Sequence, residues 1–286
     1  MPTSVAARLL AVLGTFTERT RVQTLSEISR RAGLSLTTTH RLVGELTRGG
    51  ALDRDAEGRY RIGLWLWELA TLAPHTVGLR ESALPFLEDV YEATRHHAQL
   101  AVLDGHDAVF LERIHGRGAV HTFTRVGGRL PLHATGVGLV LLAHAEPRLQ
   151  EEVITGPLRR FTEKTIRSGS RLRQVLAGVR RDGFVISDRQ IEMITVSVAA
   201  PVYGPRDTVV AALSTVVPYG ELDPMTLVPV VRAAARGISR ALGAPSASGT
   251  PPTAARTSAP DDQPARPERS ASEIDTAPSA PTAAKA

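Results

Sequence analysis

Helix-boundary signals follow one another closely near the N-terminus, and they limit this stretch to two short helices joined by a tight turn. Thr24 stands three residues before Glu27, the spacing of a capping box, and Gly33 is the residue type that commonly ends a helix in the left-handed conformation. Ser35 is a suitable N-cap for the next helix, which Gly49-Gly50 stops. This order predicts a helix-turn-helix unit.

A helix before this unit and a hairpin after it complete a recognisable domain. Residues 4–18 place their apolar side chains on one helical face, which predicts a first helix. Residues 51–54 and 59–62 are short strand-like runs around a glycine-containing turn, which predicts a hairpin. We therefore expect a winged helix-turn-helix domain over residues 1–63.

The second helix of a helix-turn-helix unit presents its N-terminal residues to base edges, while neighbouring helices and the wing touch phosphates. On the wing, Arg59 and Arg61 share one strand face, and Tyr60 and Ile62 share the face toward the core. By helical spacing Thr39 also belongs to the inner face of its helix. The residues expected to contact DNA are Ser26, Thr37, Thr38, Thr39, His40, Arg41, Arg59 and Arg61. The alternative is a small helical domain whose threonines and arginines are only solvated.

Residues 64–73 form a strongly apolar segment that contains Trp65 and Trp67. A helix this apolar is not stable alone in water and has to pack against something. Either the tryptophans fill an interface between two parts of the same chain, or they form a dimer seam. We favour the seam over a linker helix of residues 64–79, because helix-turn-helix proteins pair two half-sites on DNA.

The middle of the chain carries strand signals with helices on both sides and hairpin connections. This pattern predicts an α+β sheet domain over residues 80–243, not a regularly alternating parallel one. Helices are expected at residues 84–94, 134–144, 172–181 and 225–242, and strands at 98–103, 108–114, about 120–125, 184–187, 195–203 and 209–217. Residues 244–286 are dominated by Ala, Pro, Ser and Thr, with too few large apolar side chains to offset ordering entropy. We expect a disordered tail there.

Composition excludes several classes of function. The chain has no cysteine, which rules out disulfides, thiol nucleophiles and cysteine-based zinc sites. It has no long uncharged apolar run and no export signal, so we expect a cytoplasmic protein without a membrane partner. All but Lys164 and Lys285 of its 34 basic residues are arginine, and the formal charge is +5, which suits an anionic partner; a GC-rich genome would also enrich arginine.

Sequence motifs for catalysis or cofactor binding are missing or weak. The chain lacks the GxSxG and HExxH motifs. Gly136-Val137-Gly138 lacks the third glycine of a dinucleotide fingerprint, because Leu141 stands there. Six of the nine histidines, at positions 96, 97, 106, 115, 121 and 133, raise the question of a metal site, but they are scattered, so we expect no metal site and no cofactor.

Three stretches together resemble the IclR family of bacterial transcriptional regulators. They are residues 25–42 with Tyr60-Arg61-Ile62-Gly63, residues 130–138, and residues 182–188 with 199–202 and 210–214. The resemblance covers about residues 4–243. It implies a winged helix-turn-helix, a dimerising linker helix and a C-terminal GAF-like domain that binds a small effector. It also implies a homodimer or homotetramer on a palindromic operator of double-stranded DNA.

The effector site is expected at the start of the helix that follows Ala134. Thr135-Gly136 offers free backbone N–H groups at a helix N-terminus, which favours an anion such as a carboxylate. The resemblance adds Asp188, Ser197 and Ser214 from later strands. The complete expected set is Leu130, His133, Ala134, Thr135, Gly136, Asp188, Ser197 and Ser214. His133 can alternatively be a structural residue.

Two other functions remain open at this point. One is a small-molecule-binding protein or an enzyme without operator-specific DNA binding. The other is a scaffold whose function lies in the tail. A regulator whose effector shifts its DNA affinity is the reading that the combination of motifs favours, and it involves no catalysis.

Overall fold

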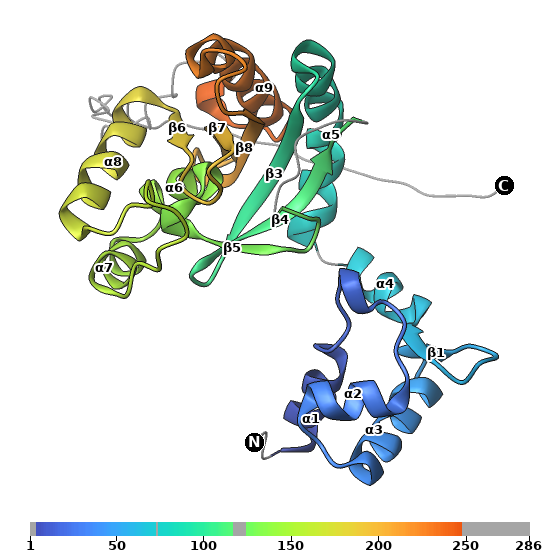
Figure 1. Cartoon of the computed structure of the whole chain (residues 1–286). Helices are drawn as coiled ribbons and strands as arrows, with labels where there is room; N and C mark the ends of the chain where they lie inside the picture. The colour runs from blue at the N-terminus through green and yellow to red at the C-terminus, as the bar shows by residue number, and fades with distance from the viewer. Residues whose placement is uncertain (1–3, 73, 117–123, 248–286) are drawn as a thin grey trace, which may run out of the picture. The chain divides into compact units, whose positions relative to one another are not determined.

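The computed structural model describes residues 4–72, 74–116 and 124–247. The strand expected near residues 120–125 falls largely outside this part of the chain, as do His121 and the tail from residue 248 onward. The described residues form an N-terminal helical domain and a C-terminal domain built on a sheet (Figure 1). No helix among the described residues combines the length and the apolarity that a membrane crossing requires.

The helix boundaries of the N-terminal domain fall where the capping signals predict. The Thr24 N–H donates to Glu27 Oε2 at 2.8 Å, and the Glu27 N–H donates to Thr24 Oγ1, which closes the capping box. Gly33 has a φ of 66°, and Ser35 accepts from the Thr38 N–H. The elements of this domain are α1 (Val5–Leu13), η1 (Glu18–Thr20), α2 (Leu25–Ala32), α3 (Leu36–Arg48), β1 (Leu52–Arg54), β2 (Tyr60–Ile62) and α4 (Leu64–Thr71).

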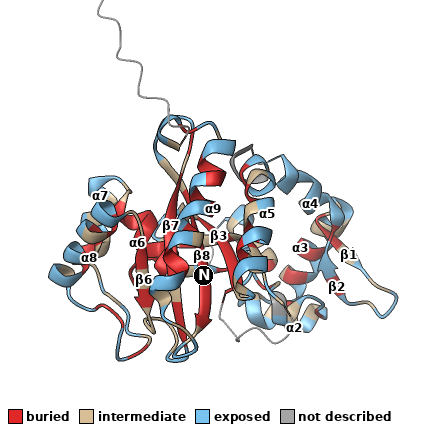
Figure 2. Cartoon of the chain, turned by 90° about the horizontal axis from the view of Figure 1, so that it is seen from above, coloured by how far each residue is buried: buried red, intermediate tan, exposed pale blue. Residues whose placement is uncertain are grey.

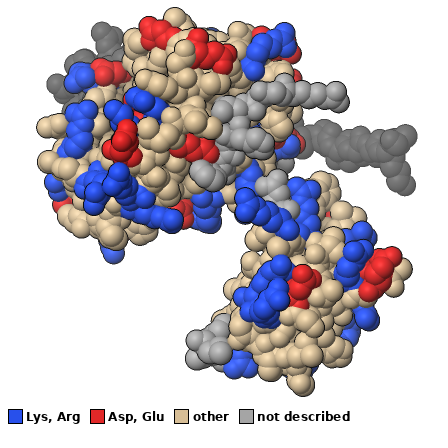
Figure 3. Space-filling model, viewed as in Figure 1, with Lys and Arg blue, Asp and Glu red and all other residues tan. Residues whose placement is uncertain are grey.

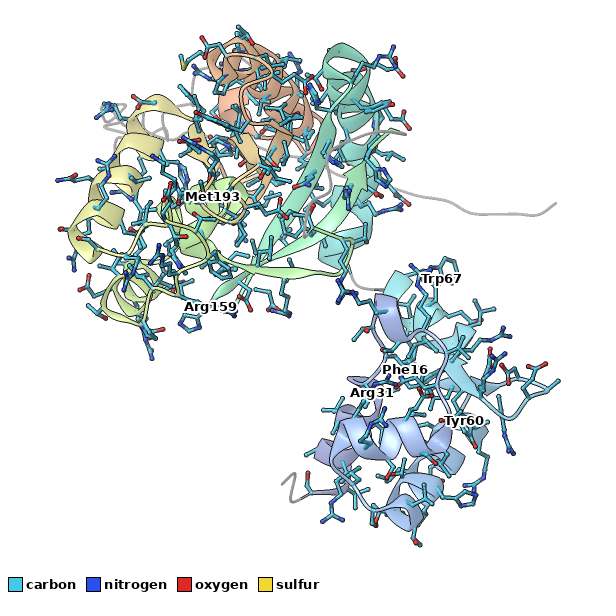
Figure 4. The ribbon with its side chains drawn as sticks, viewed as in Figure 1. Phe16, Arg31, Tyr60, Trp67, Arg159 and Met193 are labelled. Atoms are coloured by element: carbon cyan, nitrogen blue, oxygen red, sulfur yellow. The ribbon has the colours of Figure 1, made fainter. Side chains whose placement is uncertain are left out.

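A small apolar core holds the first three helices and the wing together. Val12, Ile28 and Leu42 are fully buried in it, and Tyr60 of the wing packs against them (Figure 4). Each such side chain contributes roughly 1.5–3 kcal/mol by leaving water. Ile62 is 43% exposed, so the prediction that it faces the core is wrong. The core ends beneath Tyr60, and the last residue of β2 lies beyond it.

Two glycines fix the wing against the end of α3. A Cβ on Gly63 would overlap the carbonyl oxygen of Gly50, and the Gly63 N–H donates to the Ala51 carbonyl at 2.9 Å. Backbone meets backbone here, so no side chain can move aside to make room. Glycine at position 63 is therefore required by the approach of two chain segments.

The C-terminal domain is an antiparallel sheet of six strands in the order β5-β4-β3-β8-β7-β6. Its elements are α5 (Pro74–Thr94), β3 (His97–Asp104), β4 (Asp107–Ile114), β5 (Arg129–Pro131), η2 (Leu132–Ala134), α6 (Gly136–Ala143), α7 (Pro147–Thr155), α8 (Gly169–Asp182), β6 (Val185–Asp188), β7 (Thr195–Tyr203), β8 (Val209–Pro218), η3 (Pro224–Leu227), α9 (Val228–Ala241) and η4 (Pro245–Ala247).

Helices cover both faces of this sheet, so the central strands are buried (Figure 2). On one face α5 and α9 pack against the strands, with Leu100 and Leu213 in that core. On the other face α6 and α8 pack, with Phe110 and Ala212 in a second core. The α+β class expected from the sequence is confirmed, and the space between α6 and the sheet is where polar side chains collect.

Several segments differ from the expectation. The helix α7 and the strand β5 are not among the predicted elements. The linker expected as one helix over residues 64–79 consists of α4 and the start of α5, and α5 runs from Pro74 past Pro85 instead of beginning at residue 84. Pro74 is readily accepted as the first residue of α5, because the N–H that proline lacks has no partner in a first helical turn in any case. Residues 244–247, which were expected in the tail, pack against the domain, since Ala244 is fully buried and Ser246 Oγ donates to Asp207 Oδ1 at 2.7 Å.

Candidate functional site

The outward face of α3 is a stripe of four residues at helical spacing, Thr37, Arg41, Gly44 and Arg48. It lies opposite the side of the helix that faces the core. Within the described residues Arg41 has neither an ion pair nor a hydrogen bond, whereas Arg48 pairs with Glu45 at 2.6 Å. Arg41 is thus an exposed cation on α3, without a neutralising partner among the described residues.

The other DNA-contact candidates on the helices divide into exposed and engaged residues. Ser26, Thr37 and His40 are exposed, as a contact role requires. Thr38 is half-buried, and its hydroxyl shares a hydrogen bond with Ser35 at 2.9 Å. Thr39 is fully buried, and its Oγ1 donates to the Ser35 carbonyl at 2.9 Å. The prediction that Thr39 contacts DNA is therefore wrong, and its place on the inner face follows from the helical period.

The wing arginines are paired with acids of their own hairpin. Arg59 Nε lies 2.9 Å from Asp55 Oδ2, and Arg59 Nη2 lies 3.2 Å from Glu57. The hydrogen bond with Asp55 raises the pKa of Arg59. Arg61 Nε lies 3.6 Å from Asp53, and the wing shows red beside blue in Figure 3. These exposed pairs reduce the attraction that the wing exerts on phosphates.

A pocket of about 460 Å³, its mouth included, lies between the N-terminus of α6 and the sheet. No described residue that lines it carries a positive charge, and Glu192 is the one ionisable side chain among them. The lining residues are Gln99, Phe110, Thr124, Leu130, Thr135, Gly136, Val137, Ser187, Gln190, Ile191, Glu192, Thr195, Ser197, Ser214 and Val216. Five predicted effector residues, Leu130, Thr135, Gly136, Ser197 and Ser214, are in this set.

Three serines from neighbouring strands form a row of free hydroxyls in the pocket. Ser187 pairs directly with Ser197 across β6 and β7, and Ser214 pairs with Ala199, two residues farther along β7 on the same face. Gln99 pairs with Ser214 from the other side. Ser187 and Ser214 are at most 5% exposed, and none of the three serine hydroxyls has a hydrogen-bond partner among the described residues. Hydroxyls that open into a pocket and have no partner among the described residues are available to a ligand.

The start of α6 packs closely against this row of serines. A Cβ on Gly136 would lie 2.7 Å from Ser197 Oγ and 3.3 Å from the Cβ of Ala199, so any larger residue would force the Ser197 hydroxyl to move. Thr135 caps the helix by accepting from the Gly138 N–H at 3.1 Å. This leaves the N–H groups of Gly136 and Val137 without an intrahelical acceptor, at the positive end of the helix dipole.

Acceptor atoms lie on the loop between β6 and β7. Gln190 Oε1 is buried without a hydrogen-bond partner, and Glu192 accepts a hydrogen bond of 3.4 Å from Thr195 Oγ1. Thr195 stands two residues before Ser197 on β7, so this loop and the serine row border different parts of the pocket. The site therefore offers donors beside α6 and acceptors beside the loop.

Three predicted effector residues do not line the pocket. His133 is buried, and its Nε2 lies 2.9 Å from the Arg159 carbonyl. Ala134 is fully buried in the turn before α6. Asp188 binds Arg189 through both carboxylate oxygens, at 2.7 and 3.0 Å, and this hydrogen bonding lowers the pKa of Asp188.

Sequence reasoning missed much of the lining set. Gln99 and Phe110 lie about a hundred positions before the strands that they face, and only the β3–β8 pairing brings them to the site. The sequence pattern could have identified Ser187, because this residue directly precedes Asp188 in a stretch that carries the family resemblance. Among the described residues, no three His, Asp or Glu side chains gather as a metal ion requires.

The apolar side chains of α4 are uncovered in the described part of the chain. Trp65 is 45% exposed and Trp67 64% exposed (Figure 4), and Leu64, Leu69 and Leu72 are also exposed. No residue of this helix is buried.

Comparison with known proteins gives consistent matches along the chain. Residues 5–56 match the family model for the IclR helix-turn-helix domain, and residues 71–240 match the model for the C-terminal domain of bacterial transcriptional regulator IclR. The Escherichia coli HTH-type transcriptional regulator XynR is 32% identical over 83% of this chain and 96% of that protein. The glycerol operon regulatory protein of Streptomyces coelicolor is 29% identical over 77% of this chain and 89% of that protein.

A solved structure adds a ligand to this comparison. It is an IclR homolog from Microbacterium hydrocarbonoxydans complexed with 4-hydroxybenzoate. It is 41% identical to this chain, superposes with a TM-score of 0.80, and the match covers 84% of this chain and 99% of that one.

The burial of His133 predicts a pH dependence of stability. Burial lowers the pKa of His133 in the folded state, so the unfolded chain binds a proton more readily. Stability should be full above the unfolded pKa of about 6.5 and fall as the pH drops below it. In His133→Gln, which keeps a donor for the Arg159 carbonyl, urea unfolding should show a smaller decline between about pH 7 and 5. The control is His106→Gln at an exposed histidine, which should decline like wild type. An equal decline of stability in wild type and His133→Gln would contradict the prediction.

Proposed function

Because the chain belongs to the IclR family of bacterial transcriptional regulators, we propose that it binds a palindromic operator through α3 as a homo-oligomer, and that a small carboxylate effector in the pocket changes its DNA affinity. The observation that carries the proposal is the pairing of two unsatisfied sites in one chain. Arg41 is an unneutralised cation on the reading helix, and the serine row is a set of hydroxyls in the other domain that line the pocket and have no partner among the described residues.

Arg41 is the proposed anchor for DNA. Its guanidinium can make a bidentate contact to a guanine edge or hold a phosphate, and Thr37 lies one turn before it on the same face. Arg59 and Arg61 would first have to leave their carboxylate partners. The wing is therefore assigned a positioning role, with sequence recognition given to α3.

The proposed effector is an aromatic hydroxy acid of the size of hydroxybenzoate. A carboxylate would accept from the Gly136 and Val137 N–H groups and from Ser197 and Ser214. Phe110 and other apolar residues of the lining suit a ring, and Gln190 or Glu192 can accept from a ligand hydroxyl. The 4-hydroxybenzoate complex of a 41% identical protein supports this ligand class.

The effector would act by favouring one arrangement of the two reading heads in the oligomer. Such coupling is typically worth about 1–3 kcal/mol, a change in DNA affinity of roughly 5- to 150-fold. The other function left open is a small-molecule-binding protein or an enzyme without operator-specific binding. The DNA experiment below separates it from a regulator.

DNA selection tests the role of Arg41. Purified protein should enrich a short palindrome from genomic fragments of the source organism, and Arg41→Ala should lose this enrichment. The affinity of Arg41→Ala for the selected operator should be about 10- to 100-fold lower than that of wild type. This difference in affinity should shrink as salt screens the phosphates. Arg59→Ala should bind within about threefold of wild type, because Asp55 and Glu57 already neutralise Arg59.

If neither wild type nor variant enriches any site, with and without hydroxybenzoates, the regulator proposal fails. If Arg59→Ala loses as much affinity as Arg41→Ala, the wing makes a contact that its paired arginines do not suggest.

Thermal unfolding with hydroxybenzoates tests the pocket. Ligand that binds only the folded state raises the unfolding midpoint of wild type. Ser214→Ala should weaken binding about tenfold, since it removes one charge-assisted hydrogen bond. Gly136→Ala should abolish binding, because its methyl group displaces Ser197 Oγ into the site. Ser170→Ala, at an exposed hydroxyl of α8, is the control. Equal midpoint shifts in all four proteins would place the ligand elsewhere.

Sedimentation tests the seam on α4. Trp67→Glu puts a charge on the uncovered apolar face and should shift the protein toward a lower mass, most clearly at low concentration. Leu10→Glu, at an equally exposed leucine of α1, should leave the mass unchanged. An unchanged mass of Trp67→Glu would assign oligomerisation to another surface.

A further inference from the structure

Gly44 stands in the middle of the outward stripe of α3, and nothing inside the protein requires a glycine there. Its backbone is helical without a positive φ, and a Cβ at this position would meet no atom within 4 Å. The other glycines discussed above are different, since Gly63 and Gly136 each meet a neighbour that excludes a Cβ.

A glycine in a helix interior is unfavourable compared with alanine, because it gives up more backbone freedom on folding. At an exposed site without a steric reason, alanine would make α3 more stable. The glycine therefore leaves the outward face of α3 open to something that α3 meets outside the protein.

The neighbours of Gly44 indicate what that is. Arg41 precedes it by three residues and Arg48 follows by four, so two long basic side chains flank it by about 4.5 and 6 Å along the helix axis. A helix with its side chains is 10–12 Å across, which nearly fills a major groove of about 12 Å. Because Gly44 has no side chain on the face that would point into the groove, the axis of α3 can lie deeper between the groove walls.

We propose that Gly44 is a close-approach position, at which the backbone of α3 lies against the floor of the operator's major groove while Arg41 reaches past it to a base or a phosphate. This rests on the proposed role of α3 in DNA binding. It assigns Gly44 a positioning role in recognition: it makes no polar contact, and it sets how far Arg41 can reach.

Two glycine-to-alanine variants separate this role from ordinary helix stability. Gly44→Ala and Gly178→Ala both lie inside exposed helices, and a Cβ at Gly178 has only side-chain tips of Arg181 and Asp182 at 3.9 Å. Both variants should keep or raise the midpoint of thermal unfolding. Gly178→Ala should bind the selected operator like wild type, whereas Gly44→Ala should bind at least tenfold more weakly.

A larger side chain should extend the effect, so Gly44→Leu should bind more weakly than Gly44→Ala while remaining folded. Binding of Gly44→Ala within twofold of wild type, at an unchanged or raised unfolding midpoint, would overturn the inference.

Wild type and Arg41→Ala in the same titration keep the two hypotheses apart. If Arg41→Ala binds like wild type, α3 is not the reading helix and both proposals fail. If Arg41→Ala loses the operator and Gly44→Ala keeps it, the regulator proposal stands and the close-approach role alone is rejected.

Discussion

The C-terminal domain depends on the close approach of α6 to the strands β6 and β7 at Gly136. The helix begins so near Ser197 that a single methyl group would collide with the hydroxyl. This contact brings the positive end of a helix dipole to the serine hydroxyls that line the pocket, and none of the described lining residues carries a cationic side chain. Absence of a fixed positive charge also means that the site can be empty without burying an unpaired ion.

The N-terminal domain shows how local pairing redistributes a positive charge. The wing carries arginines that look available in the sequence, yet Asp53, Asp55 and Glu57 of the same hairpin pair with Arg59 and Arg61. Arg41 has no such neighbour on its outward face. The net charge of the chain therefore says little about which arginine is free, and the geometry of one hairpin decides it.

Local signals accounted for the elements that local interactions form. The capping box at Thr24 and the left-handed Gly33 bounded α2 correctly, because both act within a few residues of chain. The helical period was also sufficient to place Thr39 inside, against its inclusion among the DNA contacts. Strand alternation failed at Ile62, because alternation gives the direction of a side chain but not the extent of the core beneath it.

The sequence by itself determined most of the helices and strands, but not α7 or β5. It also determined the winged helix-turn-helix and the family resemblance, since these follow from spacing and residue type along the chain. Only the tertiary structure decided which polar groups share a cavity. Gln99 and Ser214 become neighbours through strand register, and Asp188 leaves the expected set because Arg189 binds it. Contacts between distant segments depend on how the sheet pairs and how α6 packs on it, and no short-range pattern records that arrangement.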